Sequence, residues 1–357
     1  MDADPPNSAS AGSAPVGLAG PDRTGQTGDG ARGRAFHGTP TGALDVGFVG
    51  FGRAGAAFAV ALAEAGHRLV GVTTHSDASA ARARRFLPGA PPLAATELAA
   101  RVDVLILAVS DDAIAPVAAE LASATEPAGP RAGSVVVHLS GRHGLAPLAP
   151  VVARGASRAA IHPIMSLAGL DPAMDAAHLR STTFGVTADP AAASVARRVV
   201  TDVGGRFVEV PDEARTLYHA ALVLGANYLA ALAGASADLL AAAGVTDASA
   251  ALAPLLRVSL DNALRDGDVA TTGPVRRGDA STVAAHLEAL RAADPAAVPA
   301  YRALSQLAVQ RLVAAGLLST RAAADLRATL EASGTSAASA GPDRSDRSDG
   351  PNGPDRS

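Results

Sequence analysis

The side chains most suited to chemistry are spaced four apart on an apolar stretch in the second half of the chain. Arg215, His219, Val223 and Asn227 share one side of a predicted helix whose sequence, LYHAALVLGANYLAAL, is otherwise apolar. Each step of four turns about 40° around a helix, so the stripe covers about 120° of one face. Polar groups on an apolar face require partners. Either His219 and Asn227 converge on a substrate, or they satisfy each other or a neighbouring helix.

Two histidines near the ends of predicted strands are further candidates. His138 ends the predicted strand 134–139, and His162 follows a strand predicted at about 159–161. Ligands usually bind at the carboxyl ends of strands in α/β sheets. Each histidine could therefore touch a substrate, although each could equally be a hydrogen-bonded structural residue.

A glycine-proline turn near the end of the chain offers a cation. In the segment TGPVRRGD at 272–279, Arg277 lies at the start of a helix predicted over 281–290. A guanidinium in that place could hold a substrate carboxylate through two parallel hydrogen bonds. The alternative is a structural turn in which Arg277 pairs with Asp279.

These residues need a scaffold, and the stretch VGFVGFGRAGAAFAVAL at 46–62 supplies one. It has the order strand, glycine turn and helix, which a dinucleotide-binding βαβ unit requires. The first glycine allows the turn, the second lets a pyrophosphate approach the backbone, and the third allows close packing of the helix. The phosphates would face the free N–H groups of the helix. The predicted cofactor-binding residues of this turn are Gly50, Gly52, Arg53, Ala54 and Gly55.

The end of the second strand, 68–73, bears on the choice of cofactor. Sites that prefer NAD usually carry an acidic residue there. This chain has Thr74 and Ser76 instead, with Arg82 and Arg84 soon after. Hydroxyls and arginines suit a 2′-phosphate, so we expect NADP, with NAD as the alternative. The arginines could also form only a solvated helix face.

Two later strands also end beside the expected cofactor. The near-continuous apolar run 102–109 is typical of a parallel strand covered on both sides. We expect Val109 and Ser110 at its end, and Ser140 after the following strand, to border the cofactor.

The chain divides by composition into four parts. Residues 1–43 and 333–357 are rich in small and polar residues without periodicity and are predicted to be disordered. Residues 44–210 alternate strands and helices, and 211–332 have helical patterns throughout, including one long helix over 212–243. The sequence predicts an α/β domain of the Rossmann type, with a doubly wound sheet, followed by an all-helical domain.

Composition excludes several functions. The net charge of −4 gives no case for nucleic-acid binding, and the absence of cysteine excludes disulfides, thiolate catalysis and cysteine metal sites. No metal site is predicted. No secretory signal is visible, and the most apolar stretch, 219–245, is interrupted by polar residues. We therefore expect a buried helix rather than a membrane span, and a soluble cytoplasmic protein.

The chain resembles a family of Rossmann-like proteins with a C-terminal domain of unknown function numbered 2520. Six motifs carry the resemblance between 44 and 315: GFVGFGRAG, LAVSDD, HLSG, HP, YHAALVLGANY and TGPVRRGD. The family belongs with the 6-phosphogluconate-dehydrogenase-like and pyrroline-5-carboxylate-reductase-like enzymes. The resemblance implies a homodimer formed through the helical domain, with the active site between domains.

One departure bears on mechanism. Several relatives use lysine as a proton donor, and this chain contains no lysine. Arg215 sits about where that lysine is expected, but arginine does not release a proton near neutral pH. His219 is the better-tuned general acid, with His162 second.

Together these features predict an NADP-dependent reductase of a small carboxylate. A hydride would pass to a carbonyl or imine carbon, with ketopantoate as the first substrate to test and pyrroline-5-carboxylate as the second. His219 would donate the proton, Asn227 would orient the acceptor and Arg277 would hold the carboxylate. The competing hypothesis is a sensor or scaffold module that binds NAD(P) without turnover.

Overall fold

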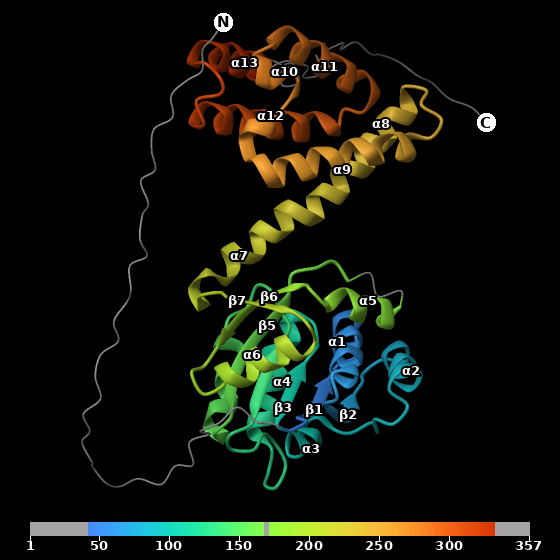
Figure 1. Ribbon diagram of the computed structural model, residues 1–357, viewed down its shortest axis with the longest axis vertical. Coiled ribbons are helices and arrows are strands. Elements are labelled where there is room, and N and C mark those ends of the chain that lie inside the picture. Colours follow the sequence, from blue (N-terminus) through green and yellow to red (C-terminus); the bar gives the residue numbers. More distant parts are fainter. Residues whose placement is uncertain (1–41, 168–170, 333–357) are drawn as a thin grey trace, which may run out of the picture.

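The computed structural model describes residues 42–167 and 171–332. A seven-stranded sheet carries helices on both faces, and a separate group of helices follows it along the chain (Figure 1). The fold class predicted from the sequence is confirmed. The two tails predicted at 1–43 and 333–357 lie outside the described residues, except for Gly42 and Ala43 at the end of the first tail.

The order of the strands creates a crevice at one edge of the sheet. Neighbouring strands run parallel except β5 and β6, which are antiparallel. From β1 the chain goes first to β2 on one side and then to β3 on the other, and ligands bind where the order reverses in this way. The strands, in spatial order, are β2 Arg68–Thr73, β1 Asp45–Val49, β3 Val104–Leu107, β4 Val135–His138, β5 Ser157–Pro163, β6 Thr183–Ala188 and β7 Arg206–Glu209.

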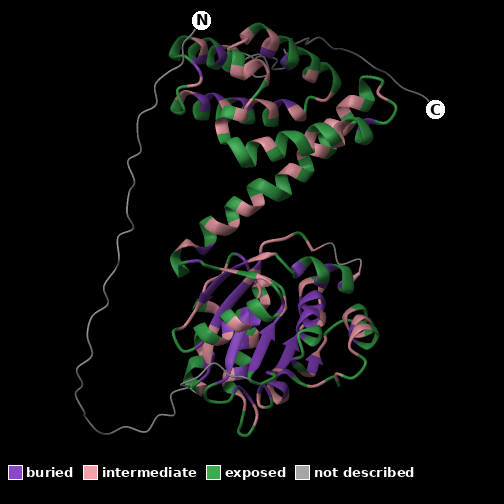
Figure 2. Ribbon diagram, in the orientation of Figure 1, coloured by how far each residue is buried: buried purple, intermediate pink, exposed green. Residues whose placement is uncertain are grey.

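Two apolar cores hold helices against the two faces of the sheet, as the buried residues in Figure 2 show. The central strands β3 and β4 are buried along their whole length, as expected for strands covered on both sides. One face carries α1 Arg53–Glu64, α2 Asp77–Phe86, α5 Pro172–Leu179 and α6 Ala193–Asp202. The other carries α3 Ala95–Ala99, α4 Asp111–Ser123 and the 3₁₀ helix η1 Ala146–Arg154.

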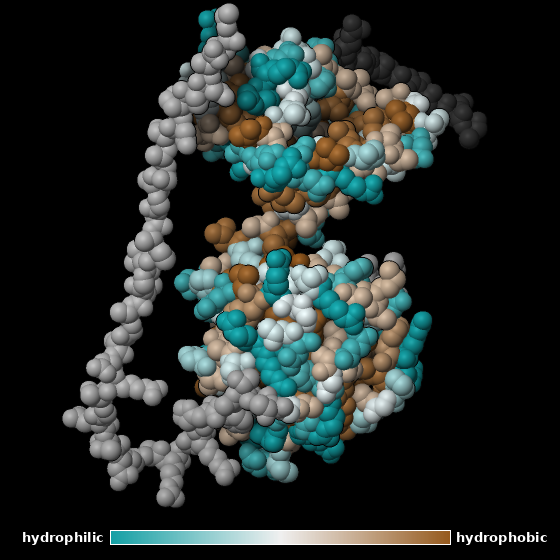
Figure 3. Space-filling view, in the orientation of Figure 1, coloured by the Kyte–Doolittle hydropathy of each residue, from teal (hydrophilic) through white to brown (hydrophobic). Residues whose placement is uncertain are grey.

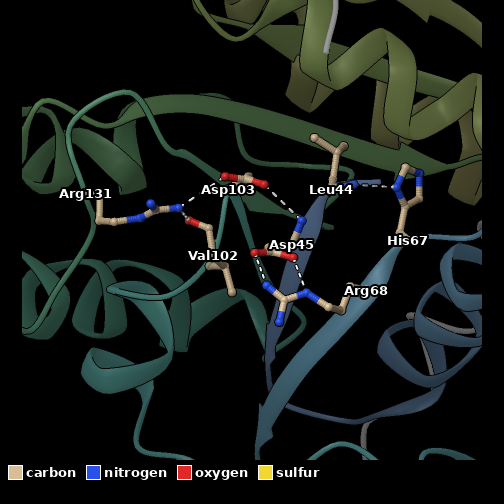
Figure 4. A network of polar contacts seen from close by, with 7 residues as sticks. All are labelled: Leu44, Asp45, His67, Arg68, Val102, Asp103 and Arg131. Atoms are coloured by element: carbon tan, nitrogen blue, oxygen red, sulfur yellow. Dashed lines mark hydrogen bonds and ion pairs between the residues drawn. The ribbon is translucent and has the colours of Figure 1, made fainter. Parts of the chain in front are cut away.

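The amino edge of the sheet is closed by a polar network (Figure 4). Arg68 pairs with Asp45 at the starts of β2 and β1, and Arg131 pairs with Asp103 at 3.2 Å. Asp103 Oδ2 also accepts the backbone N–H of Asp45 at 3.0 Å. Charges at this edge are thus paired with one another, whereas the carboxyl edge carries the glycine turn.

The helical region begins with a nearly continuous helix. It comprises the 3₁₀ turn η2 Asp212–Ala214, α7 Arg215–Leu222, a π-helical segment Val223–Asn227 and α8 Tyr228–Ala242. The remaining helices are α9 Ala248–Asp266, the 3₁₀ turn Gly267–Ala270, α10 Gly273–Arg277, α11 Ala280–Ala293, α12 Ala297–Ala314 and α13 Thr320–Ala332. A third core joins α11, α12 and α13.

The structure corrects the prediction that the long helix is buried. The sequence predicts that 219–245 is a buried helix, but α8 contains no buried residue in the single chain. By length and composition, Asp212–Ala242 is the one described helix that could cross a membrane, with mean hydropathy 1.5 and none of its most apolar window buried. Apolar side chains indicate that a helix packs against another surface. They do not indicate whether that surface belongs to the same chain.

Candidate active site

The glycine turn after β1 has the geometry of a phosphate cradle. Gly50 has φ +89°, and a Cβ there would lie 2.6 Å from the carbonyl oxygen of Ala108, so only glycine fits. A Cβ on Gly55 would lie 2.6 Å from the Ala108 methyl group, which brings α1 close to the segment after β3. A Cβ on Gly52 would meet nothing within 4 Å. The space beside Gly52 is therefore open where a pyrophosphate would approach.

A cavity of about 460 Å³ opens at this turn. Gly52 is the N-cap of α1, and no side chain caps the helix, so its first N–H groups face the cavity free. Seven predicted cofactor-binding residues lie together in its lining: Gly52, Arg53, Ala54, Gly55, Val109, Ser110 and Ser140. The donor set fits the phosphates of a dinucleotide.

The other three predicted cofactor residues, Gly50, Thr74 and Ser76, are not in this lining, although Gly50 makes the turn just before it. Ser76 instead caps α2, since its side chain accepts the N–H of Ser79, and Thr74 lies half-buried just after β2. Arg82 reaches back from α2, and its Nη1 donates to the carbonyl oxygen of Phe51 at 2.8 Å. This contact places a guanidinium beside the glycine turn at the end of β2, where a 2′-phosphate would lie.

A second cavity, of about 510 Å³, adjoins the first. The two share Arg53 and Leu167 in their linings. The second cavity contains the polar side chains of His162, Ser166, His219 and Asn227 among apolar ones. The structure therefore brings His219, Asn227 and His162 to one cavity next to the phosphate cradle.

Arg215 has a structural role that the sequence does not reveal. It is 1% exposed, and its guanidinium donates to Thr187 Oγ1 at 2.8 Å. Further hydrogen bonds go to the carbonyl oxygens of Ser140, Ala160 and Gly185, at 3.3, 2.7 and 3.1 Å. Burial lowers the pKa of Arg215 to about 10, so it remains a cation at neutral pH. Arg215 fastens the start of α7 to the carboxyl edge of the sheet and does not point at a substrate.

His138 is a structural histidine. It is fully buried, its Nδ1 accepts the N–H of Ser140 at 3.2 Å, and its Nε2 lies 2.8 Å from the carbonyl oxygen of Gly144. These contacts define a neutral ring with hydrogen on Nε2. Burial lowers its pKa to about 4. The ring orders the loop that follows β4, on which Ser140 borders the cradle.

The π-helical segment explains how His219, Val223 and Asn227 reach the same cavity. Residues four apart drift around an α-helix, but a π turn takes up more residues and reduces the drift. Val223–Asn227 is the π segment, and all three residues line the second cavity. The sequence VLGAN carries no signal for this irregularity. Among the described residues, neither His219 nor Asn227 has a hydrogen-bond partner, so both are available to a ligand.

Arg277 is not brought to this cavity within one chain. It is exposed at the end of α10, in the group of helices remote from the sheet (Figure 1). Asp279 caps α11 by accepting the hydroxyl of Thr282 at 2.6 Å and its backbone N–H at 3.0 Å. Those bonds with Thr282, a further bond from Ser281 and the charge of Arg277 hold the pKa of Asp279 at about 2. The segment therefore forms the start of α11, and Arg277 does not line the second cavity of its own chain.

The comparisons with known proteins agree with this architecture. A Rossmann-like domain matches residues 34–163, and the domain of unknown function DUF2520 matches residues 182–308. The chain therefore carries a Rossmann-like domain followed by a DUF2520 domain. None of the curated proteins compared with this DUF2520 protein matches it.

Solved structures show the same fold. BF3122 of Bacteroides fragilis, a candidate NADP oxidoreductase, is 20% identical with a TM-score of 0.62, over 74% of this chain and 98% of its own. An imine reductase of Streptomyces aurantiacus is 21% identical with a TM-score of 0.51, over 79% and 99%. A 1-pyrroline-5-carboxylate reductase of Streptococcus pyogenes is 15% identical with a TM-score of 0.50, over 82% and 98%.

Proposed function

We propose that this DUF2520 protein is an NADP-dependent reductase that transfers a hydride to the carbonyl or imine carbon of a small carboxylate. The observation that carries the proposal is the junction of the two cavities at Arg53 and Leu167. A dinucleotide with its phosphates on the turn at Gly52 would place its nicotinamide ring toward the second cavity. When bound, NADPH would supply the hydride, and side chains of the second cavity would act on the acceptor.

The roles of the side chains follow from their places in the second cavity. His219 is half-buried and can exchange protons with solvent, so it would donate the proton that balances the hydride. Asn227 would orient the acceptor through its amide. Arg53 is the cation that lines this cavity, and the partner subunit's Arg277 would complete the carboxylate site.

The substrate class is supported by the chemistry of these groups and by the relatives. Imine and pyrroline-5-carboxylate reductases share the fold. Purified protein with NADPH should oxidise the cofactor in the presence of one member of a panel of 2-oxo acids and cyclic imines, with ketopantoate and pyrroline-5-carboxylate tested first. Cofactor binding with no turnover on any member would instead favour a sensor, although two histidines, an amide and a hydroxyl in one cavity favour catalysis.

The preference for NADP rests on Arg82 and can be tested separately. A charge-assisted hydrogen bond contributes about 1.5–3 kcal/mol, so Arg82→Gln should weaken NADPH binding by roughly 10- to 100-fold. NADH lacks the 2′-phosphate and should bind the variant as it binds the parent. Calorimetric titration of both cofactors measures the difference. Arg84→Gln, an exposed arginine on the same helix, is the control; equal losses for NADPH and NADH in Arg82→Gln would contradict the assignment.

We further propose a cytoplasmic homodimer in which a second copy covers the long helix. On the long helix, Leu217 and Leu224 are 76% and 59% exposed, and Leu264 on α9 is 78% exposed. Hydrophobic surface gathers around α7 (Figure 3). A largely apolar groove of about 620 Å³ lies between α8 and the helices α11 and α12. Surfaces of this kind mark protein interfaces.

Leu264→Glu should dissociate the dimer because it places a charge on an exposed apolar position of α9, which does not line the second cavity. Sedimentation equilibrium should give twice the chain mass for the parent and a single chain for the variant at micromolar concentration. Met174→Glu replaces a residue on α5 that is 61% exposed and should remain dimeric. A parent that sediments as a single chain would refute the dimer.

A further inference from the structure

Tyr218 contacts the candidate site although the sequence does not single it out. Its hydroxyl oxygen lies 2.8 Å from Nδ1 of His162, and the two rings meet edge to face with centroids 5.8 Å apart. His162 in turn meets His219 edge to face at 5.9 Å. The ring of His162, near the end of β5, thus contacts the rings of Tyr218 and His219, which both belong to α7. Both histidines line the second cavity.

The phenol reaches His162 because of a glycine on the neighbouring strand. Gly185 of β6 stands opposite His162 of β5 in the antiparallel register. A Cβ at residue 185 would collide with the hydroxyl oxygen of Tyr218. The backbone of β6 therefore leaves a space that the tyrosine hydroxyl fills.

This contact decides which nitrogen of His162 carries hydrogen. Among the described residues, the Tyr218 hydroxyl has no acceptor other than Nδ1. If Nδ1 carried the hydrogen, it would donate to the phenol oxygen, and the hydrogen of the half-buried phenol would remain without a partner in the protein, which is costly. Donation from the hydroxyl to Nδ1 removes that cost, and it leaves hydrogen on Nε2.

The environment of His162 keeps its ring neutral. Burial and the nearby cation Arg215 on α7 lower the pKa of His162 to about 4, and burial raises that of Tyr218 to about 12. His219 on α7 and His138 on β4 lower the pKa of His162 further, whereas Asp111 on α4 opposes them. Neither ring ionises near neutral pH, so the hydroxyl and the imidazole meet as neutral groups.

The other ring nitrogen of His162 lies against the loop that follows β4. Nε2 of His162 passes beside Gly141, where a Cβ would lie 2.9 Å away, and it has no hydrogen-bond partner among the described residues. Gly141 follows Ser140, which borders the phosphate cradle. The N–H at Nε2 is therefore a donor without an acceptor at the junction of the cofactor loop and the second cavity.

We infer that Tyr218 is a positioning residue that holds His162 in its Nε2–H tautomer, so that His162 donates a hydrogen bond to the carbonyl oxygen or imine nitrogen of the substrate. This inference rests on the proposed reductase function. As the hydride adds to the carbon, the π electron pair moves to that oxygen or nitrogen. The proton that completes the product comes from His219, and His162 keeps its own. One histidine polarises the acceptor as a neutral donor and the other supplies the proton.

The tautomer can be measured without a substrate. In protein labelled with ¹⁵N-histidine, long-range ¹H–¹⁵N correlations distinguish the protonated nitrogen from the bare one, and His162→Gln assigns the signal. The parent should show His162 with hydrogen on Nε2 at pH 7, and Tyr218→Phe should show a mixture of both tautomers. Hydrogen on Nδ1 in the parent, or no change in Tyr218→Phe, would overturn the inference.

A second tyrosine-histidine pair provides a matched control. Tyr301 on α12 lies 2.9 Å from Nδ1 of His286 on α11, with rings in the same edge-to-face arrangement. Tyr301→Phe removes the same kind of contact outside the cavity and should leave the His162 signal unchanged.

Kinetics test the consequence for catalysis. With any substrate that the panel identifies, Tyr218→Phe should lower kcat about tenfold, the factor of one neutral hydrogen bond lost in the transition state. The dissociation constant of NADPH should not change. An unchanged kcat in Tyr218→Phe would refute the role. If no substrate is found, the proposed function fails, while the tautomer measurement still decides the assignment of Tyr218.

Discussion

Replacing Arg215 with methionine should lower the free energy of unfolding by about 3 kcal/mol, because the fully buried guanidinium donates four hydrogen bonds. The guanidinium joins Thr187 on β6 to the backbone carbonyls of Ser140, Ala160 and Gly185. Methionine fills similar space but donates nothing. Chemical unfolding followed by circular dichroism measures the loss.

The same substitution should also disturb the site, since Arg215 and Asp212 together fix where the long helix begins. Asp212 Oδ1 accepts the N–H of Leu145 at 2.7 Å, on the loop after β4. Without Arg215, we expect α7 to shift and turnover to fall, while the cradle around Gly52 still binds NADPH. Arg215→Lys should recover only part of the stability because an ammonium cannot reproduce the planar fork. An unfolding curve of Arg215→Met equal to that of the parent would show that this anchor is dispensable.

His219→Ala should reduce kcat by roughly 10²- to 10⁴-fold, the usual contribution of a general acid. NADPH binding should persist, since His219 lines the second cavity and not the cradle. Stopped-flow measurement of NADPH oxidation with the substrate found by the panel separates hydride transfer from product release.

Two further variants sharpen the test of His219. Glutamine can hydrogen-bond but cannot donate a proton in this pH range, so His219→Gln should be as slow as His219→Ala. His178→Ala changes an exposed histidine on α5 and should match the parent. If His219→Gln retained full activity, His219 would only orient the substrate and the proton would come from elsewhere.

The sequence predicted the strand, glycine turn and helix around residues 50–55 because the constraints on them are local. A turn with positive φ needs glycine at 50, and the approach of α1 to Ala108 needs glycine at 55. The apolar run before the turn and the alanine-rich run after it show the strand and the helix directly. The fold class follows from the same alternation of patterns.

The sequence predicted the second cavity only in part because its geometry depends on contacts between distant residues. A helical wheel places Arg215 on the same face as His219. In the structure, the side chain of Arg215 packs against the carboxyl edge of the sheet and is fully buried. The π-helical segment and the space above Gly185 arise from packing between distant residues. No sequence pattern therefore predicted the contact of Tyr218 with His162. The sequence assigned Arg277 to the substrate site because arginine can bind a carboxylate. In the structure, the turn that contains Arg277 leads into α11, which Asp279 caps. Domain limits and the roles of individual site residues remain predictions.

The most direct test of the account is a calorimetric titration of NADPH into the parent and into Gly52→Val. Residue 52 has φ −72° and ψ −164°, a conformation open to valine, and a Cβ there meets no atom of the protein within 4 Å. We therefore expect the valine side chain to leave the fold intact and to occupy the space assigned to the pyrophosphate. We expect one NADPH per chain for the parent and no measurable binding for the variant. No binding to the parent, or equal affinity in both proteins, would contradict the central claim.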